Sequence, residues 1–570
     1  MILRVIYCVL LYLPEALVLE RSLIITTTTG PIKGKINRFN NIEYYSYQGI
    51  PYAENPTGNL RFMPPVPKEP WNNTLDATKE GAICSQLPRG YFMEKTTEDC
   101  LKVNVFVPAN GTHKLLPVMV FIHGGVLQYL SGNIDCCQGP QFLLEREIIF
   151  VTMNFRLGPF GFLSLGIEEA SGNAGLKDIL LCLKWVKENI KRFGGDPNKV
   201  TIAGHSSGSL IVNYFMLTEK SSGLFNQAIL LSGSAFSPRS FARHSKEIAF
   251  SLVKELGIET DDVYETLNQL QKIDASELLR AYENMSETYD SPLRIYAPFV
   301  VSKEVESDHA LFTDEIESFR KNNTIPQKVP ALVGITAQEA ISIIPYIFSK
   351  TSGIEKLREN PENFIPSNIE YPMGSQRSKD LGRMISEMYF GGEYMRNLTL
   401  TTLIEFISDT QYIFGVNYWV KKYKNMVDSN ALYFYIFDFI GDLNRCNMFF
   451  KSSVNGSCHG DDIQYFFLTD ASRNVLGHID ERTKKVMDLM INFISNFIHY
   501  GNPTPDSLNN DIKWPDYGKE QNYLLLNENP VAAKFNSNVL YPRMQFWEKV
   551  YDDYYDYMDN GGEIQKKIIP

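Results

Sequence analysis

A serine flanked by glycines stands where an apolar strand gives way to a helix. The pentapeptide Gly204-His-Ser206-Ser-Gly208 follows the β-branched run Val200–Ala203 and precedes a helical pattern that begins at Ser209. In a strand–turn–helix of this kind the glycines let neighbouring elements approach, and the strained turn lifts the serine hydroxyl above the sheet edge. Ser206 is therefore a candidate nucleophile if a base removes its proton. Taken alone, the motif also fits an ordinary glycine-rich turn.

Backbone donors for an oxyanion are predicted at two places. The N–H group of Ser207 lies at the N-terminus of the predicted helix and points toward the space above Ser206. A second glycine-rich turn, His123-Gly-Gly-Val126, follows the apolar run Val118–Ile122. N–H groups exposed by such a turn can surround a carbonyl oxygen as it becomes negatively charged. The alternative is a turn that needs glycine only for its dihedral angles.

A base and an acid follow other predicted strands. His459 stands in the turn-rich loop Gly456–Asp462, and Glu339 follows the strand Ala331–Val333. The resulting order Ser…Glu…His is the chain order of the α/β-hydrolase triad. A metal site of His459, Asp461 and Asp462 is the alternative, but no HExxH motif or Cys/His cluster completes it. The sequence therefore predicts nucleophilic catalysis without a metal or a cofactor.

The elements that position these residues form a mostly parallel sheet. Several runs are apolar at consecutive positions, which is typical of strands covered on both faces. These runs are Val118–Ile122, Ile148–Thr152, Val200–Ala203, Ala228–Leu231, Ala331–Val333 and Leu432–Ile436, with a further strand at Leu101–Pro108 and a hairpin within Ile24–Asn41. The helical pattern Gly175–Arg192 lies between two of them and predicts a βαβ crossover. A second amphipathic helix is predicted at Lys484–His499. We expect an α/β fold with helices on both faces of the sheet.

Two segments interrupt the series of strands. Residues 240–325 (the first insertion) and 340–425 (the second insertion) are rich in helical patterns, polar residues and tyrosine. We interpret them as walls of a pocket above the sheet, within one domain that spans residues 19–570.

Composition narrows the possible partners. The chain has 570 residues, 44% of them hydrophobic and 21% charged, and a formal net charge of −11. The negative charge argues against nucleic acid as a partner and against a polybasic membrane anchor. Beyond the N-terminus no apolar run is long enough for a transmembrane anchor. The sequence leaves the oligomeric state undetermined.

The N-terminus and the glycosylation motifs are typical of a secreted chain. Residues 1–18 have the apolar core of a signal peptide, although a buried first strand is the alternative. Asn-x-Ser/Thr sequons are candidate glycosylation sites. They occur at Asn72, Asn110, Asn284, Asn322, Asn397 and Asn455.

The cysteines fit the same compartment. Of the 8 cysteines, Cys84 and Cys100 are close enough in sequence to close a small loop, as are Cys446 and Cys458. Cys182 lies in a helical pattern and is expected to be a buried thiol. The pairing of the adjacent Cys136 and Cys137 stays open.

Together these motifs resemble the type-B carboxylesterase/cholinesterase family, and within it the insect carboxylesterases. The resemblance extends from about Gly30 to Tyr551. The matching segments are Gly49–Ala53, Glu98–Leu101, His123–Gly125, Asn154–Gly158, Gly161–Leu163, Asn173–Leu176, Phe193–Pro197, Gly204–Gly208, Ser232–Gly233 and His459–Asp462.

The resemblance implies an α/β-hydrolase fold and specific roles. Ser206 corresponds to the nucleophile, His459 to the general base and acid, and Glu339 to the acid that orients His459. Gly125, Val126 and Ser207 occupy the oxyanion-hole positions. The resemblance also implies a Cys84–Cys100 disulfide and a structural ion pair between Glu98 and Arg156.

Several residues depart from the family pattern. Val126 replaces a usual Gly or Ala, and its branched side chain is expected to narrow the pocket or tilt its N–H group. His205 replaces the usual Glu before the nucleophile and Ser207 the usual Ala after it. Juvenile hormone esterases usually have Gln at the position of His205, which weighs against that substrate. No tryptophan occurs between Cys84 and Cys100, so we disfavour choline esters.

Two functions follow. The first is a secreted serine carboxylesterase that hydrolyses uncharged small-molecule esters through an acyl-enzyme, in a gorge lined by apolar side chains of the insertions. The second is a catalytically weak or inactive binding protein that sequesters such ligands, because the family includes members without activity. All three triad residues are present, which favours the esterase.

Overall fold

The computed structural model describes residues 23–555 apart from short internal gaps. The gaps are 41, 88–95, 110–113, 135–137, 289–292, 294–296, 317–318, 320–324, 346, 348–356, 393, 428–430, 447–453 and 509–511. The predicted signal peptide, the pair Cys136 and Cys137, and the sequons at Asn110 and Asn322 therefore lie outside the described residues.

An 11-stranded sheet runs through the molecule in the order β18-β17-β16-β15-β12-β11-β7-β8-β6-β4-β3. Its strands are β3 (Lys35–Phe39), β4 (Ile42–Pro51), β6 (Lys102–Pro108), β7 (Leu116–Ile122), β8 (Ile149–Met153), β11 (Gly195–His205), β12 (Gln227–Leu231), β15 (Ala331–Thr336), β16 (Leu432–Phe437), β17 (Asn522–Leu526) and β18 (Val531–Lys534). In this spatial order, the neighbouring strands from β17 to β8 pair in parallel. The strands outside them, at both edges of the sheet, pair antiparallel. The predicted strands and the predominantly parallel sheet are confirmed.

Short strands and helices complete the fold. The short strands are β1 (Ile24–Thr26), β2 (Pro31–Lys33), β5 (Leu75–Asp76), β9 (Ser164–Ile167), β10 (Ala170–Ser171), β13 (Phe241–Ala242) and β14 (Val301–Ser302). The α-helices are α1 (Gln141–Leu144), α2 (Gly158–Phe162), α3 (Ala174–Asn189), α4 (Ser207–Leu217), α5 (Ser245–Glu255), α6 (Val263–Lys272), α7 (Ala275–Thr288), α11 (Gln376–Phe390), α12 (Leu400–Ser408), α13 (Phe414–Met426), α15 (Asp470–Arg473), α16 (Glu481–Tyr500) and α17 (Tyr541–Tyr554). Both helices predicted from periodicity are present as α3 and α16.

The central strands bury both of their faces, as their continuous apolar runs predict. Along β7, Val118 and Val120 belong to one core cluster, whereas Met119 and Phe121 belong to another. The first cluster includes α3 and α4, and the second includes α16. Because successive side chains of a strand point to opposite faces, each cluster lies on its own side of the sheet.

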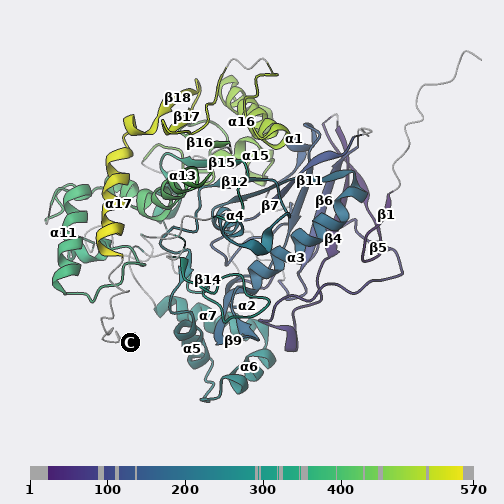
Figure 1. The fold of residues 1–570 in the computed structure, drawn as a ribbon, viewed down its shortest axis with the longest axis horizontal. Coiled ribbons are helices and arrows are strands. Elements are labelled where there is room, and N and C mark those ends of the chain that lie inside the picture. Colours follow the sequence, from purple (N-terminus) through teal and green to yellow (C-terminus); the bar gives the residue numbers. More distant parts are fainter. Residues whose placement is uncertain are drawn as a thin grey trace, which may run out of the picture.

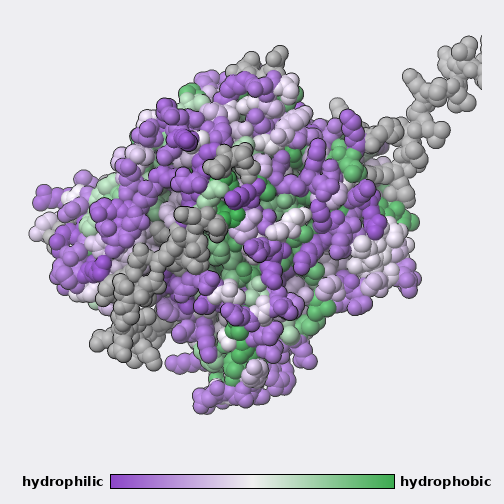
Figure 2. Space-filling model, viewed as in Figure 1, coloured by the Kyte–Doolittle hydropathy of each residue, from purple (hydrophilic) through white to green (hydrophobic). Residues whose placement is uncertain are grey.

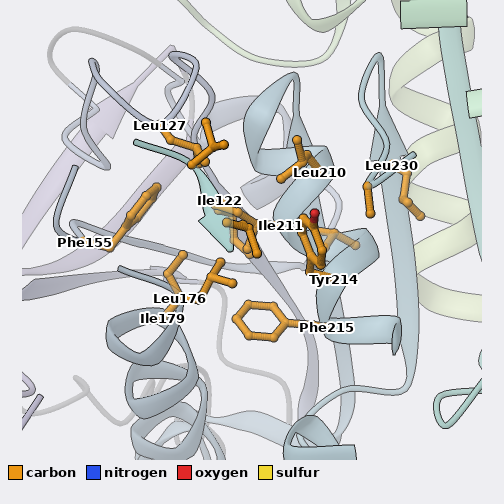
Figure 3. Close-up of a cluster of buried hydrophobic side chains, with 14 of the residues drawn as sticks. Ile122, Leu127, Phe155, Leu176, Ile179, Leu210, Ile211, Tyr214, Phe215 and Leu230 are labelled. Carbon is orange, nitrogen blue, oxygen red and sulfur yellow. The ribbon is translucent and has the colours of Figure 1, made fainter. Parts of the chain in front are cut away.

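A compact apolar contact holds α4 beneath the proposed nucleophile. Figure 3 shows Phe215 of α4 pointing toward Leu176 and Ile179 of α3, while Leu210 lies at the other end of the cluster near Leu127. These side chains are almost completely excluded from solvent. The helix that begins at the Gly-x-Ser-x-Gly turn is thus fixed by packing along its length.

The two insertions form separate helical groups outside the sheet. In Figure 1, α5, α6 and α7 gather at the bottom of the view, and α11 lies beside α17 at the left. Between α12 and α13 the chain forms a π-helical turn, Asp409–Ile413. Such turns are uncommon and often occur at functional sites.

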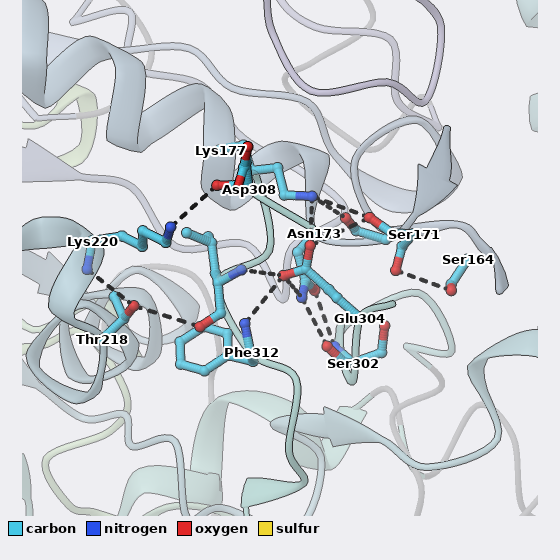
Figure 4. A network of polar contacts seen from close by, with 12 residues as sticks. Ser164, Ser171, Asn173, Lys177, Thr218, Lys220, Ser302, Glu304, Asp308 and Phe312 are labelled. Atoms are coloured by element: carbon cyan, nitrogen blue, oxygen red, sulfur yellow. Dashed lines mark hydrogen bonds and ion pairs between the residues drawn. The ribbon is translucent and has the colours of Figure 1, made fainter. Parts of the chain in front are cut away.

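A buried ion pair ties the first insertion to the start of α3 (Figure 4). The Glu304 carboxylate lies 2.5 Å from the ammonium nitrogen of Lys177 and accepts hydrogen bonds from the Asn173 amide at 2.9 Å and the Leu311 N–H at 2.9 Å. Asn173 adopts a left-handed conformation, φ 57°, at the N-cap of α3. This network fixes the path of residues 301–312 against the helix.

The cysteine predictions are confirmed within the described residues. Cys84–Cys100 and Cys446–Cys458 are disulfides, and Cys182 is a buried free thiol.

The predicted ion pair between Glu98 and Arg156 is wrong. Glu98 pairs with Arg61 at 2.6 Å, and Arg156 pairs with Asp178 of α3 at 2.6 Å. The Asp178 carboxylate also accepts the backbone N–H of Arg156, at 3.0 Å, so the guanidinium and its own backbone are held by one acid. A bidentate partner of this kind is what a buried guanidinium requires.

The surface is mainly hydrophilic. Figure 2 shows polar residues over most of the visible face, with hydrophobic residues in small patches. None of the helices in the described part of the chain combines the length and apolar character needed to cross a bilayer. The sequon residues Asn72, Asn284, Asn397 and Asn455 are all exposed.

Candidate active site

Ser206 occupies a strained turn between β11 and α4. Its backbone has φ 59° and ψ −124°, a region that non-glycine residues rarely adopt. The Ser206 N–H donates to the Leu231 carbonyl of β12 at 2.8 Å, which anchors the turn to the sheet. A Cβ atom at Gly208 would lie 2.1 Å from the Ile122 carbonyl oxygen, and one at Gly233 would lie 2.0 Å from that of Ser206. Glycine is therefore sterically required at both positions.

The loop after β7 is strained as well. Gly125, Val126 and Leu127 have φ values of 101°, 53° and 62°. Val126 is β-branched, so its left-handed conformation is an outlier that the surrounding contacts must maintain. One such contact comes from the Ser207 hydroxyl, which accepts the Leu127 N–H at 3.2 Å. An alanine in place of Ser207, as the family resemblance leads us to expect, could not accept this hydrogen bond.

His459 and Glu339 meet as predicted. The Nδ1 atom of the His459 ring lies 2.6 Å from the Glu339 Oε2. The backbone N–H of His459 also donates to the backbone carbonyl of Glu339 at 3.2 Å. The other carboxylate oxygen accepts the Ser232 hydroxyl at 2.6 Å and the Thr336 N–H at 2.8 Å. Glu339 is completely buried, and this burial raises its pKa to about 7. The hydrogen bonds from Ser232 and Thr336 act in the opposite direction.

Two aromatic rings flank the His459 imidazole. The His205 ring lies 4.5 Å from it between centroids, and the Tyr412 ring lies 4.6 Å from it. Burial is the main reason that the pKa of His459 falls to about 3, and the positive charges of Arg445 and Arg239 lower it further. The neutral imidazole that a general base requires is thus favoured.

The structure does not join Ser206 to His459 by a hydrogen bond. Ser206 and Tyr412 line the same cavity, and the Tyr412 ring contacts the His459 ring, whereas His459 is not among the residues that line this cavity. Hydrogen bonds between catalytic groups are often long without substrate and shorten in the complex. The three predicted residues therefore converge on one region, with the Glu339–His459 bond formed and the Ser206–His459 bond unformed.

The cavity beside Ser206 is small, with a volume of about 60 Å³. Its described lining includes Val126 and Leu127, serines of the turn after β12, Ala297 and Val300 from the first insertion, and Gln411 and Tyr412 from the second. The insertions therefore wall a pocket, as expected. The expected apolar lining is confirmed, because apolar atoms make up most of the surface that faces the cavity.

The alternative metal site is not assembled. Asp461 binds the Asn444 amide at 2.9 Å and the Cys458 N–H at 2.7 Å, while Asp462 accepts the Tyr435 hydroxyl at 2.6 Å. Burial raises the pKa of Asp462 to about 7. Within the described residues, the one cluster with metal-ligand spacing is Cys446, Cys458 and Asp461. Its two cysteines form a disulfide and therefore offer no thiolate to a metal.

Four residues of the site were missed by reasoning from sequence. They are Ser232 and Thr336, which bind Glu339, and Arg239 and Tyr412, which reach the cavity. Ser232 stands in a Ser-Gly pair that carries the family resemblance, so a signal existed. Arg239 and Tyr412 had no such signal, because neither residue belongs to a recognised motif.

Known proteins are similar to this chain over most of its length. The sequence profile of the carboxylesterase family matches residues 21–547. Juvenile hormone esterase of Heliothis virescens is 31% identical over 513 residues, covering 87% of this chain and 88% of its own. Venom carboxylesterase-6 of Apis mellifera is 29% identical over 546 residues, covering 92% and 94%.

A solved structure is similar over almost the whole fold. The crystal structure of juvenile hormone esterase from Manduca sexta, with OTFP covalently attached, superimposes with a TM-score of 0.83 and 28% identity. The match covers 93% of this chain and 99% of that chain. The chain therefore belongs to the carboxylesterase family, has the α/β-hydrolase fold, and is a carboxylic ester hydrolase.

Proposed function

We propose that this protein is a secreted serine carboxylesterase in which Ser206, His459 and Glu339 form the catalytic triad. The observation that carries the proposal is the 2.6 Å hydrogen bond between Glu339 and His459 Nδ1, because the His459 ring contacts Tyr412, which lines the same cavity as the strained Ser206. Glu339 would hold the proton on Nδ1 and leave Nε2 free to accept one.

In the proposed reaction, Nε2 of His459 removes the proton from the Ser206 hydroxyl while Oγ attacks the ester carbonyl carbon. The tetrahedral intermediate collapses as the alcohol leaves with the proton from His459, which gives an acyl-enzyme. Water then loses a proton to His459, attacks the acyl carbon and releases the acid and the free Ser206. In the first half of the reaction the proton passes from Ser206 through Nε2 to the alcohol, and in the second half it passes from water through Nε2 back to Ser206.

The oxyanion is proposed to bind the N–H groups of Gly125, Val126 and Ser207. Among the hydrogen bonds of the described residues, none uses these three donors. Each such donor is typically worth ~10²–10³ in rate. The hydroxyl of Ser207 supports the arrangement, because it binds Leu127 and thereby connects the oxyanion loop to the start of α4.

Features outside the site support secretion. We propose that residues 1–18 are a signal peptide and that residues 19–570 form one catalytic domain. The exposed sequons at Asn72, Asn284, Asn397 and Asn455 would be accessible to glycosylation. The disulfides Cys84–Cys100 and Cys446–Cys458 fit an oxidising compartment. One relative is named a venom carboxylesterase, and the structural relative forms a covalent adduct with OTFP.

The test compares the purified protein with Ser206→Ala. We expect hydrolysis of p-nitrophenyl acetate and covalent labelling by a fluorophosphonate, both abolished in the variant. Labelling without turnover would favour the sequestering alternative, for which the strained Val126 of the oxyanion loop is the structural argument. Absence of both reactions in folded protein would overturn the proposal.

A further inference from the structure

His205, the last residue of β11, lies beside both the proposed nucleophile and the proposed base. It precedes Ser206 in the chain, and its ring lies 4.5 Å from the His459 ring between centroids, at an interplanar angle of 36°. The residue is buried, with 7% of its surface exposed. His205 therefore connects the strand that leads to the nucleophile with loop 456–462 (the base loop), which carries His459.

The His205 ring also packs against the backbone of the base loop. A Cβ atom at Gly460, the residue after His459, would lie 3.1 Å from Cε1 of His205, which is closer than side chains usually approach. Gly460 has φ 80°, a conformation that favours glycine. The backbone carbonyl oxygen of His205 would lie 2.8 Å from a Cβ atom at Gly124, in the turn after β7. Because His205 is packed closely at both ends, the size of its ring sets how near the base loop comes to β11.

The surroundings of the His205 ring favour its uncharged form. Nε2 is buried and, among the described residues, has no hydrogen-bond partner. A protonated imidazole has two N–H donors, so protonation would leave a buried donor without an acceptor. Burial, and after it the charges of His459 and Arg445, also lower the pKa of His205 well below its usual value. His205 therefore presents an uncharged ring to His459.

Several other groups determine the charge and orientation of His459. Together with His205 they are the Glu339 carboxylate at Nδ1, the Tyr412 ring, and the guanidinium groups of Arg239 and Arg445. Of these groups, His205 is the one that belongs to the strand directly before Ser206. Its contact with His459 therefore bears on the separation between the base and the nucleophile.

We propose that His205 is a positioning residue of the triad, and that its uncharged ring holds the base loop where Nε2 of His459 can reach the Ser206 hydroxyl. The inference rests on the proposed esterase function and assigns a further residue to that site. His205 is not among the residues that line the cavity, so it acts through His459 rather than on the substrate. A glutamate, which the family resemblance leads us to expect at this position, would instead place a negative charge beside His459.

The first test removes the ring and then restores it. His205→Ala should lower kcat for p-nitrophenyl acetate by ~10²-fold with little change in KM, because a small displacement of a catalytic group is costly. His205→Phe keeps an uncharged ring and should recover most of the wild-type kcat. Rates are taken for each molecule that a fluorophosphonate labels at saturation, so that loss of folded protein does not enter the comparison.

Phe493→Ala provides the matched control. This change also removes a buried ring, which lies on α16 and contacts Trp514 at 5.4 Å between centroids. The variant should lose stability but keep the wild-type kcat for each labelled molecule. A general loss of packing would lower kcat in Phe493→Ala and His205→Ala alike, whereas positioning of the base requires His205.

The second test is the pH profile of kcat/KM, which a purely structural role would not move. His205→Glu places a carboxylate beside His459 and favours the protonated base, so the acid limb should move to higher pH by about 1–3 units. His205→Phe should leave the acid limb at its wild-type position, because one uncharged ring replaces another. If His205 were a cation, its replacement by phenylalanine would also move the limb to higher pH, since a neighbouring positive charge would be lost.

Three results would overturn the inference while leaving the esterase intact. They are a wild-type kcat in His205→Ala, a kcat in His205→Phe as low as that in His205→Ala, and an acid limb in His205→Glu that coincides with the wild-type limb. If His205→Ala yields no folded protein, the pH profiles of His205→Phe and His205→Glu decide the question. If the wild type neither hydrolyses p-nitrophenyl acetate nor reacts with a fluorophosphonate, the proposed function fails, and this inference fails with it.

Discussion

Two buried glutamates of this protein have different partners for their carboxylate groups. The side chains of Glu304 and Glu339 are both 0% exposed. Glu304 lies 2.5 Å from the ammonium group of Lys177. Glu339 instead contacts the His459 imidazole, a hydroxyl and a backbone N–H. The first arrangement compensates the carboxylate charge with an ammonium group, and the second supplies a cation only when the imidazole is protonated.

The difference explains why one glutamate is structural and the other suits catalysis. Glu304 joins the first insertion to α3 through its ion pair and its hydrogen bonds. Glu339 has no cationic partner in the resting protein, and in the proposed reaction it gains one when His459 becomes a cation. The cost is stability, because burial of this carboxylate raises its pKa to about 7.

The largest expected effect is on activity. Glu339→Gln places an amide N–H opposite Nδ1 of His459 and favours the wrong tautomer, so kcat for p-nitrophenyl acetate should fall by ~10⁴, as in other triads. The matched control is Glu304→Gln, which should keep a normal kcat for each molecule that a fluorophosphonate titrates. Comparable losses in the two variants would mean that Glu339 has no special role.

The next effect is on stability. Lys177→Met leaves the Glu304 carboxylate buried without its cation, which should lower the free energy of unfolding by about 3–5 kcal/mol. Urea denaturation measures this change. The double variant Lys177→Met/Glu304→Gln should recover much of the loss, because both charges are then removed. If Lys177→Met unfolds at the same urea concentration as the wild type, the ion pair between Lys177 and Glu304 does not contribute to stability in this way.

The smallest effect is the pH dependence of stability. The pKa of Glu339 is raised from 4.5 to about 7, so its favourable contribution is present below pH 4.5 and is lost as the pH rises through 7. Glu339→Gln has no carboxyl group to ionise at this position, so its stability does not decrease in this way as the pH rises. The variant should therefore be more stable than the wild type at pH 8, by up to about 3 kcal/mol, and this advantage should shrink toward pH 5.

Urea denaturation at the two pH values measures this dependence. The Glu304→Gln variant should show no such gain at pH 8, since it loses an ion pair. An advantage of Glu339→Gln that is equal at pH 5 and pH 8 would contradict the raised pKa.

Local sequence patterns determined the strands, α3, α4 and the position of Ser206. Apolar runs predicted strands buried on both faces because a strand in a parallel sheet needs apolar residues at every position. The glycines around Ser206 were equally informative, since they mark the tight turn in which Ser206 has a φ of 59°. Such constraints act between neighbours in the chain or on the backbone itself, so the sequence alone expresses them.

Tertiary packing decided which charges meet. The sequence predicted that Glu98 pairs with Arg156, but the fold brings Arg61 to Glu98 and Asp178 to Arg156. It also brings Arg239 and Tyr412 to the cavity beside Ser206, from segments separated by more than a hundred residues. The energy of such contacts depends on the distance and burial of side chains that come together only when the domain is folded. For this reason the sequence determined the family and the candidate triad residues, whereas the structure decided which charged side chains pair.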